Sequence, residues 1–183
     1  MSHAGRSLVL LPWALAALIA PLAVSGGAAP EVPAPGGPSP SAAAGYPLRV
    51  RDDAGAALSL IRPPQRIISL TVHTDDILTE LVDHGRLLGV TAFAADPAIS
   101  NVAGRVQDIP HRLTLNVEVI LALQPDLVFV ANWSEADKVA QLRGAGVPVF
   151  VSASPLDIEA VAAVIRTVAA LVGEADRGEQ MIT

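Results

Sequence analysis

The sequence of 183 residues contains no cysteine. This absence excludes a disulfide framework, a thiol nucleophile, a cysteine-ligated zinc site and a lipid-modified N-terminal cysteine. Lysine is nearly absent too, because Lys138 is the one lysine among 12 cationic residues, and the formal net charge is −6. Nucleic-acid binding needs clustered positive charge, so this composition argues against a nucleic-acid partner.

The motifs that would carry catalysis or nucleotide binding are also missing. No glycine-rich dinucleotide fingerprint follows a predicted strand, and the sequence has no phosphate-binding Gly-Lys-Ser/Thr loop. It has no Gly-x-Ser-x-Gly elbow, and no basic partner is evident for Ser69, Ser152 or Ser154, which disfavours an envelope hydrolase. We therefore expect no catalytic residue, no metal site and no resident cofactor.

The first 30 residues have the pattern of an export signal. Arg6 precedes the apolar run Leu8–Val24, small residues follow, and residues 7–30 carry no charge. This order is typical of a secretory signal peptide. A membrane anchor is the alternative, but the run has 17 residues and two prolines interrupt it. We expect a signal peptide over residues 1–28 and a periplasmic product that is neither membrane-inserted nor a lipoprotein.

A segment rich in glycine and proline follows the signal. The chain has 14 glycines and 15 prolines, and 11 of these 29 residues lie between Gly26 and Pro47. Such a segment buries too little apolar surface to offset the entropy of ordering it. Residues 29–46 are therefore predicted to be a disordered tether, and about 137 residues remain for one ordinary core.

From Tyr46 onward the pattern is that of an α/β fold. Tyr46–Ile61 predicts a β-hairpin that turns at Asp52–Gly55, and short apolar strands then alternate with helices. This order predicts a parallel sheet with flanking helices, a Rossmann-like lobe preceded by the hairpin and ending in a long helix. The expected strands are Arg66–Leu70, Leu87–Val90, Leu127–Val130 and Val147–Val151.

The helices are predicted from capping residues and apolar periodicity. Thr74 is expected to cap the first helix, with Asp75 and Asp76 as carboxylates of its first turn. Asn116 is expected to cap a short helix that Pro125 stops. The others are Ser134–Ala145 and one long helix from Pro155 toward the C-terminus, whose inward residues would be Ile158, Val161, Val164, Ile165, Val168 and Leu171.

In parallel sheets of this kind, ligands bind beyond the carboxyl ends of the strands. His73 follows the first strand there, and it could contact a ligand, serve as an axial metal ligand or simply belong to the helix start. Trp133 could cover a large planar or apolar ligand, or pack under the next helix, and Phe93 has the same two interpretations. The expected ligand surface is therefore formed by four loops: Ser69–Thr74, Thr91–Pro97, Ala131–Ser134 and Ser152–Ser154.

Several short motifs occur in a fixed order: the hairpin, Pro64-Gln-Arg-Ile, Asp75-Asp-Ile-Leu, Leu88-Gly-Val-Thr, Asn116-Val-Glu and Pro125-Asp-Leu-Val. Each motif is weak alone, but the ordered set is specific. From Tyr46 to the end, the sequence resembles the N-terminal lobe of the periplasmic substrate-binding proteins of ABC importers for iron–siderophores, haem and cobalamin.

The resemblance implies a ligand cleft between two lobes joined by a long helix. It assigns residues 47–156 to the N-terminal α/β lobe and residues 157–183 to the start of the interlobe helix, with the second lobe missing from this sequence. It places the carboxylate that docks onto permease arginines at Glu118; as an anion in the first turn of a helix, Glu118 also suits the helix dipole without any partner. The ligand-contacting residues that it implies are Thr71, Val72, His73, Thr74, Phe93, Asn132 and Trp133.

The resemblance also implies the function and its partners. The chain would capture a metal chelate (ferric siderophore, haem or cobalamin) and deliver it to the permease subunits of an ABC importer. Two departures leave the ligand open: the loop Ala92–Pro97 lacks the tyrosine often found there, and Val72-His73 stands where small residues and proline are usual. The alternative is a stand-alone exported α/β module that binds an envelope protein.

Overall fold

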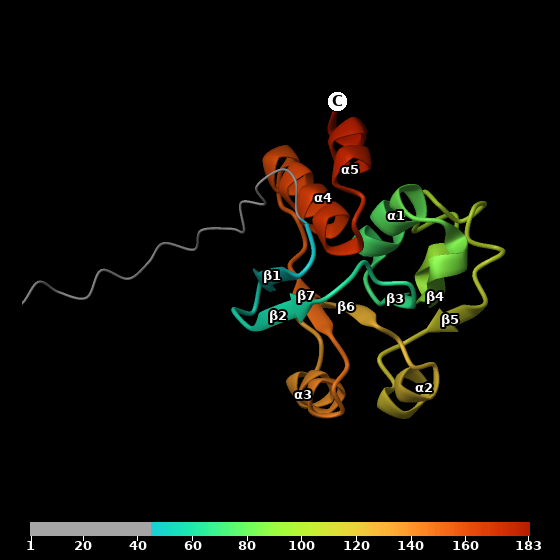
Figure 1. Cartoon of the computed structure of the whole chain (residues 1–183). Helices are drawn as coiled ribbons and strands as arrows, with labels where there is room; N and C mark the ends of the chain where they lie inside the picture. The colour runs from blue at the N-terminus through green and yellow to red at the C-terminus, as the bar shows by residue number, and fades with distance from the viewer. Residues whose placement is uncertain (1–44) are drawn as a thin grey trace, which may run out of the picture. The chain divides into compact units, whose positions relative to one another are not determined.

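The computed structural model describes residues 45–183 (Figure 1). The predicted signal peptide and nearly all of the predicted tether lie outside the described residues. Two sheets are present in the described part, a two-stranded hairpin and a five-stranded sheet with helices on both faces. This architecture confirms the predicted α/β class.

The hairpin is formed by β1 (Leu48–Arg51) and β2 (Ala57–Leu60), which pair antiparallel with Leu48 opposite Leu60. Its turn is at the predicted residues, and Gly55 adopts a positive φ of 82°, which glycine tolerates without steric cost. The alternation of Leu58 and Leu60 with exposed residues directs one face of β2 into the core. The predicted hairpin is therefore confirmed.

The five strands of the main sheet are all parallel and lie in the order β5-β4-β3-β6-β7. Four of them match predicted strands, whereas β5 was not predicted, because it has three residues at the sheet edge and carries no apolar run. The strands are β3 (Ile67–Ser69), β4 (Leu87–Thr91), β5 (His111–Leu113), β6 (Leu127–Ala131) and β7 (Val149–Ser152).

Each face of the sheet carries its own apolar core because successive strand residues point to opposite faces. On one face, Phe129 and Phe150 pack with the helices α1 (Val72–Leu81), α4 (Ile158–Val172) and α5 (Ala175–Ile182). The other face packs against α2 (Val117–Ala122) and α3 (Ala136–Gly144). Figure 1 shows these two helical layers above and below the sheet. Two 3₁₀ turns, η1 (His84–Arg86) and η2 (Ala92–Ala95), flank β4.

The predicted cap of the first helix is wrong by three residues. Thr71, not Thr74, is the N-cap of α1, and its hydroxyl accepts the Thr74 backbone N–H at 3.1 Å. The two threonines are both competent caps in the sequence Thr71-Val-His-Thr74. The Thr74 hydroxyl instead lies beneath the helix start, 2.6 Å from the Ser69 hydroxyl. Which of the two threonines caps the helix is therefore decided by tertiary packing and not by the local sequence.

The predicted long C-terminal helix is present as α4, but it ends at Gly173 and the chain continues as a second helix, α5. Gly173 ends α4 with a φ of 80°, and the next amide, that of Glu174, donates to the Ala169 carbonyl at 2.8 Å. The inward face was correct for its C-terminal half, where Val168 is buried. It was wrong for the N-terminal half, because Ile158 is 87% exposed and Val161 is 41% exposed.

The corner between α4 and α5 is fixed by side chains from distant parts of the chain. The Arg86 guanidinium donates to the Val172 carbonyl at 2.6 Å and to the Glu174 carboxylate at 2.8 Å. The Tyr46 hydroxyl donates to the Leu171 carbonyl at 2.9 Å. These bonds hold α5 against the body of the described domain.

The hairpin turn covers the outer edge of β7. The Asp53 N–H donates to the Val151 carbonyl at 3.1 Å, and the Val151 N–H donates to the Asp52 carboxylate at 3.2 Å. An exposed strand edge is a site of unwanted pairing, so this contact protects it. Within residues 45–183, no helix combines the length and the apolar character needed to cross a bilayer.

Candidate ligand-binding site

The strand order of the sheet reverses at β3, which lies at its centre. The chain adds β4 and β5 on one side of β3 and then β6 and β7 on the other. In open α/β sheets, this topological switch point opens a crevice beyond the carboxyl ends of the strands. We call the loops that follow β3, β4, β6 and β7 the strand-end surface. All of the predicted ligand contacts lie on it or directly beneath it.

A buried network of hydroxyl groups supports the loop after β3. The Thr74 hydroxyl lies 2.6 Å from that of Ser69 and 2.7 Å from that of Thr71, and all three side chains are buried. The hydroxyls of Thr71 and Thr74 thus form hydrogen bonds to other groups of the protein. Their role visible in the structure is to fix the backbone of the loop that carries Val72 and His73.

His73 bridges two of the strand ends. Its Nε2 atom lies 2.8 Å from the Ser152 hydroxyl at the end of β7, and its Nδ1 atom lies 3.2 Å from the Thr71 hydroxyl. Burial lowers the pKa of His73 below its ordinary value of 6.5, although the carboxylates of Asp53 and Asp76 oppose this effect. The imidazole is therefore neutral near pH 7, and it can bind a ligand through a nitrogen released by one of these hydroxyls.

Two aromatic side chains are displayed on the strand-end surface. Trp133 follows β6 and is 76% exposed, while Phe93 lies in η2 after β4 and is 55% exposed. β4 and β6 are the two neighbours of β3 in the sheet, so the rings follow the strands on either side of the His73 loop. The alternative in which Trp133 packs under the following helix is wrong. Asn132 is exposed beside it, and Val72 is half-buried.

Asp75 is a buried acidic group whose importance the sequence did not reveal. Its carboxylate accepts the Thr91 hydroxyl at 2.6 Å and the Thr91 backbone N–H at 3.2 Å. Burial raises the pKa of Asp75 to about 7, although hydrogen bonds from Ser69 and Thr91 partly oppose the rise. The Thr91 hydroxyl in turn caps η2 by accepting the Ala94 N–H, so this carboxyl helps to place the loop that displays Phe93.

The position of Glu118 is compatible with docking onto a permease and with a role as an anion at the start of a helix. It is exposed in the first turn of α2, whose N-cap is the predicted Asn116, with the side-chain oxygen accepting the Val119 N–H at 3.0 Å. No ion pair of Glu118 is present within residues 45–183. The same described residues hold no cluster of three or more metal-ligating side chains.

Comparisons with known proteins identify the family of this chain. A family model described as "Periplasmic binding protein" matches residues 67–183. The chain belongs to the periplasmic binding protein family. This is a family of binding proteins and not of enzymes, which agrees with the expectation that the chain carries no catalytic site. The resemblance inferred from the ordered motifs is thereby confirmed.

Two relatives are 28–29% identical to this chain over the aligned residues. A cobalamin-binding protein of Halobacterium salinarum is 29% identical over 171 residues, which are 93% of this chain and 45% of that protein. An uncharacterized ABC transporter substrate-binding lipoprotein, YvrC of Bacillus subtilis, is 28% identical over 108 residues, or 57% of this chain and 33% of that protein.

A solved structure of similar fold supports the same assignment. The haem-binding protein HmuT superposes with a TM-score of 0.59 at 26% identity, over 78% of this chain and 46% of HmuT. The chain thus spans about half the length of HmuT and of the cobalamin-binding relative.

Proposed function

We propose that the chain provides the N-terminal half of a ligand cleft in a periplasmic receptor, which captures a metal chelate and delivers it to the permease of an ABC importer. The observation that carries this proposal is the pair of exposed rings, Trp133 and Phe93, on either side of the His73 loop. The cobalamin-binding relative and the haem-binding structure support the ligand class, because both ligands are large metal-containing macrocycles.

The chemistry of the strand-end surface suits such a ligand. Exposed aromatic rings gain contact area on a flat macrocycle while losing little conformational entropy. The neutral imidazole of His73 can donate a hydrogen bond to a substituent of the ligand or coordinate its metal. The metal would arrive as part of the transported ligand, and we propose no resident cofactor.

The strand-end surface belongs to one lobe, so it would bury one side of the ligand. A second lobe would bury the other side, as the two-lobed architecture implied by the resemblance requires. This arrangement would make binding to the described half alone weak, because much of a ligand's surface must be buried for tight binding. The export signal over residues 1–28 and the periplasmic location of the mature protein belong to the same proposal.

Replacement of Trp133 by alanine is expected to weaken binding of the cognate chelate by roughly tenfold, because one stacked ring contributes about 1 kcal/mol or more. We would titrate the mature protein with haemin, cyanocobalamin and several ferric siderophores and follow tryptophan fluorescence. The variants W133F and W133A would be titrated by ligand absorbance. Saturable binding of one chelate that is retained in W133F and weakened in W133A is the expected result.

The control is Ile61→Ala, because Ile61 is an exposed apolar residue in the segment that leads into the start of β3, the end of that strand opposite to the strand-end loops. It should leave the affinity unchanged. If no chelate changes the fluorescence of Trp133 even at the high concentrations that weak binding to one half requires, or if W133A binds as tightly as the unaltered protein, the proposed ligand class is wrong.

Replacement of Glu118 by arginine is expected to abolish the productive contact with the permease while leaving ligand affinity intact. A charge reversal opposite arginines places like charges in contact, which costs several kcal/mol of docking energy. Chelate uptake and stimulation of the importer's ATPase by the loaded receptor would be measured together with the ligand Kd. A Glu135→Arg variant on the exposed start of α3 is the matched control. Normal uptake by E118R would show that Glu118 only complements the dipole of α2.

A further inference from the structure

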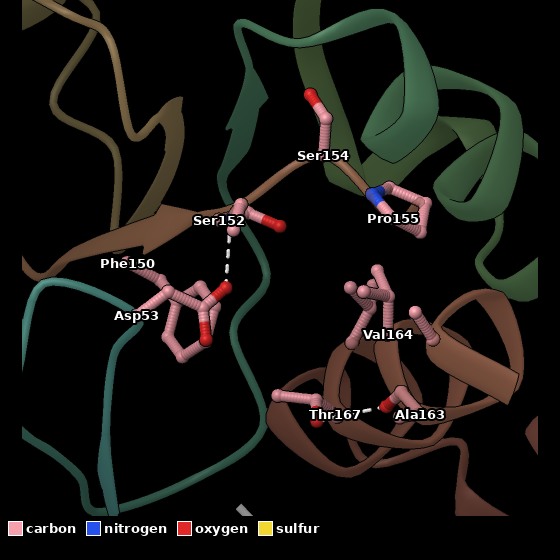
Figure 2. Close-up of a pocket in the computed structure, with 11 residues that line it drawn as sticks. Asp53, Phe150, Ser152, Ser154, Pro155, Ala163, Val164 and Thr167 are labelled. Atoms are coloured by element: carbon pink, nitrogen blue, oxygen red, sulfur yellow. Dashed lines mark hydrogen bonds between the residues drawn. The ribbon is translucent and has the colours of Figure 1, made fainter. Parts of the chain in front are cut away.

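A pocket lies beside the strand-end surface, at the loop that follows β7. Its volume is about 190 Å³. Figure 2 shows its lining residues, which come from the end of β7, the hairpin turn and α4. An apolar cavity of about 150 Å³ accommodates benzene, so this pocket has room for one small ring or a short aliphatic chain. Its apolar walls are formed by Phe150, Pro155, Ala160, Ala163, Val164 and Val168.

One charged side chain lines this pocket. The Asp53 carboxylate accepts the Ala153 N–H through Oδ2 at 2.7 Å, and within residues 45–183 it forms no ion pair with a cationic group. The Ser152 hydroxyl, which also lines the pocket, already lies 2.8 Å from Nε2 of His73. The Thr167 hydroxyl donates to the Ala163 carbonyl at 2.9 Å. The Asp53 carboxylate is therefore the charged group that an occupant of the pocket can pair with.

Nothing in the neighbourhood neutralises this carboxylate. The charge of Asp53 raises the pKa of His73, but burial lowers this pKa by more. The imidazole therefore stays neutral near pH 7 and does not neutralise Asp53. The N-terminus of α4 carries a partial positive charge. Two carboxylates offset it: Asp157 accepts the Ala160 N–H at 2.7 Å, and Glu159 lies in the first turn. The mouth of the pocket is thus negative and its interior apolar.

We propose that this pocket binds a small organic ammonium compound, with its ring or aliphatic chain between β7 and α4 and its ammonium group on Asp53. An ammonium group donates charge-assisted hydrogen bonds to a carboxylate, and the apolar part gains from leaving water. A neutral ligand of the same shape lacks the charge-assisted hydrogen bond to Asp53, and the Asp53 carboxylate repels an anionic ligand. The pocket adjoins the proposed chelate surface through the loop after β7, but it includes neither exposed ring, so ammonium binding and chelate binding can be tested separately.

The test uses three probes of one shape and different charge. The full-length protein, labelled with ¹⁵N, is titrated with benzylammonium chloride, benzyl alcohol and sodium benzoate at pH 7 while amide shifts are recorded. Benzylammonium is expected to shift the amides of Ala153, Ser154 and Ala163 saturably, with an affinity roughly fivefold above that of benzyl alcohol. Benzoate is expected to produce no saturable shift at these amides.

Variants separate the charge from the cavity. Asp53→Asn keeps an acceptor for the Ala153 N–H and is expected to lower benzylammonium affinity to the level of benzyl alcohol. Ala163→Leu fills the pocket and is expected to abolish binding of both probes, and Asp137→Asn, on exposed α3, should change neither. Equal affinities for the amine and the alcohol, an unchanged D53N titration or no shift at these amides would each overturn the proposal. D53N changes one exposed carboxyl and should fold normally, so its titration tests the role of the charge even if A163L fails to fold.

Discussion

Replacing Asp75 with asparagine is expected to stabilise the protein by an amount that grows with pH, from almost nothing at the ordinary aspartate pKa of 3.8 to about 4 kcal/mol at pH 7 and above. The carboxyl is completely buried, and burial raises its pKa to about 7. In the unfolded chain the same group ionises near its ordinary pKa. Between these two values the unfolded state therefore binds fewer protons than the folded state.

The sign of the effect follows from that difference in bound protons. Stability falls as pH rises wherever the unfolded state has fewer protons, so the contribution of Asp75 is present at acidic pH and lost as pH rises through about 7. Asparagine carries no proton to lose, and its side-chain oxygen can still accept the Thr91 N–H and hydroxyl. The D75N variant should consequently lack this loss of stability.

The measurement is the free energy of unfolding in urea, determined for both proteins across the pH range from 4 to 8. The difference between D75N and the unaltered protein is the quantity to follow, because other acidic groups such as Asp108, whose pKa is lowered by its hydrogen bond to His84, act in the opposite sense. Asp137→Asn makes the same chemical change on an exposed helix and should give parallel curves. Parallel curves for D75N would mean that the Asp75 carboxyl titrates normally in the folded protein.

The sequence was sufficient to predict the order of strands and helices but not all of their boundaries. Local signals were strong where polar and apolar residues alternate, as in β1 and β2, or where a buried strand such as β6 is a continuous apolar run. The break between α4 and α5 had a local signal that was missed, since Gly173 directly follows the last periodic apolar residue, Val172. The edge strand β5 had no such signal.

The candidate site was predictable in position but not in detail. Parallel strands place their carboxyl ends at one edge, so the loops carrying His73, Phe93 and Trp133 could be assigned to one surface. Whether Trp133 is exposed or packed depends on how the neighbouring helices lie, and no residue within its own segment decides this. The same holds for the bond between His73 and Ser152, which are 79 positions apart in the sequence. The pocket beside Asp53 likewise exists because the hairpin turn approaches β7 and α4, which only the folded chain shows.

Replacing Asp52 with alanine is expected to lower the free energy of unfolding by about 3 kcal/mol or more. Asp52 is 5% exposed, and its carboxylate is the acceptor for several groups at once. One oxygen accepts the backbone N–H groups of Ala54 and Ala56, at 3.1 and 2.8 Å. The other accepts the Val151 N–H and pairs with the Arg143 guanidinium. Alanine would leave these donors without their acceptor at a site that water reaches poorly.

The loss should exceed that of an ordinary surface carboxylate for two reasons. Removing Asp52 leaves the half-buried Arg143 guanidinium without its partner and three backbone N–H groups without their acceptor, and a buried donor left unpaired costs about 1–3 kcal/mol. The hairpin turn also loses one of its attachments to the edge of β7, the bond from the Val151 N–H, which weakens the cover of that edge. Asp83→Ala is the matched comparison, because Asp83 is exposed and caps only η1 through the Gly85 N–H at 2.7 Å; it should cost about 1 kcal/mol.

A double-mutant cycle with Arg143 separates the ion pair from the backbone hydrogen bonds. If the pair dominates, D52A and R143A together should cost clearly less than the sum of the single changes, since either one already breaks the pair. If the backbone bonds to Ala54, Ala56 and Val151 dominate, the costs should be nearly additive, and Asp52→Asn should recover most of the stability by restoring acceptors without charge. A loss below about 1 kcal/mol for D52A would mean that the hairpin turn is held to β7 mainly by the backbone bond from Asp53 to Val151.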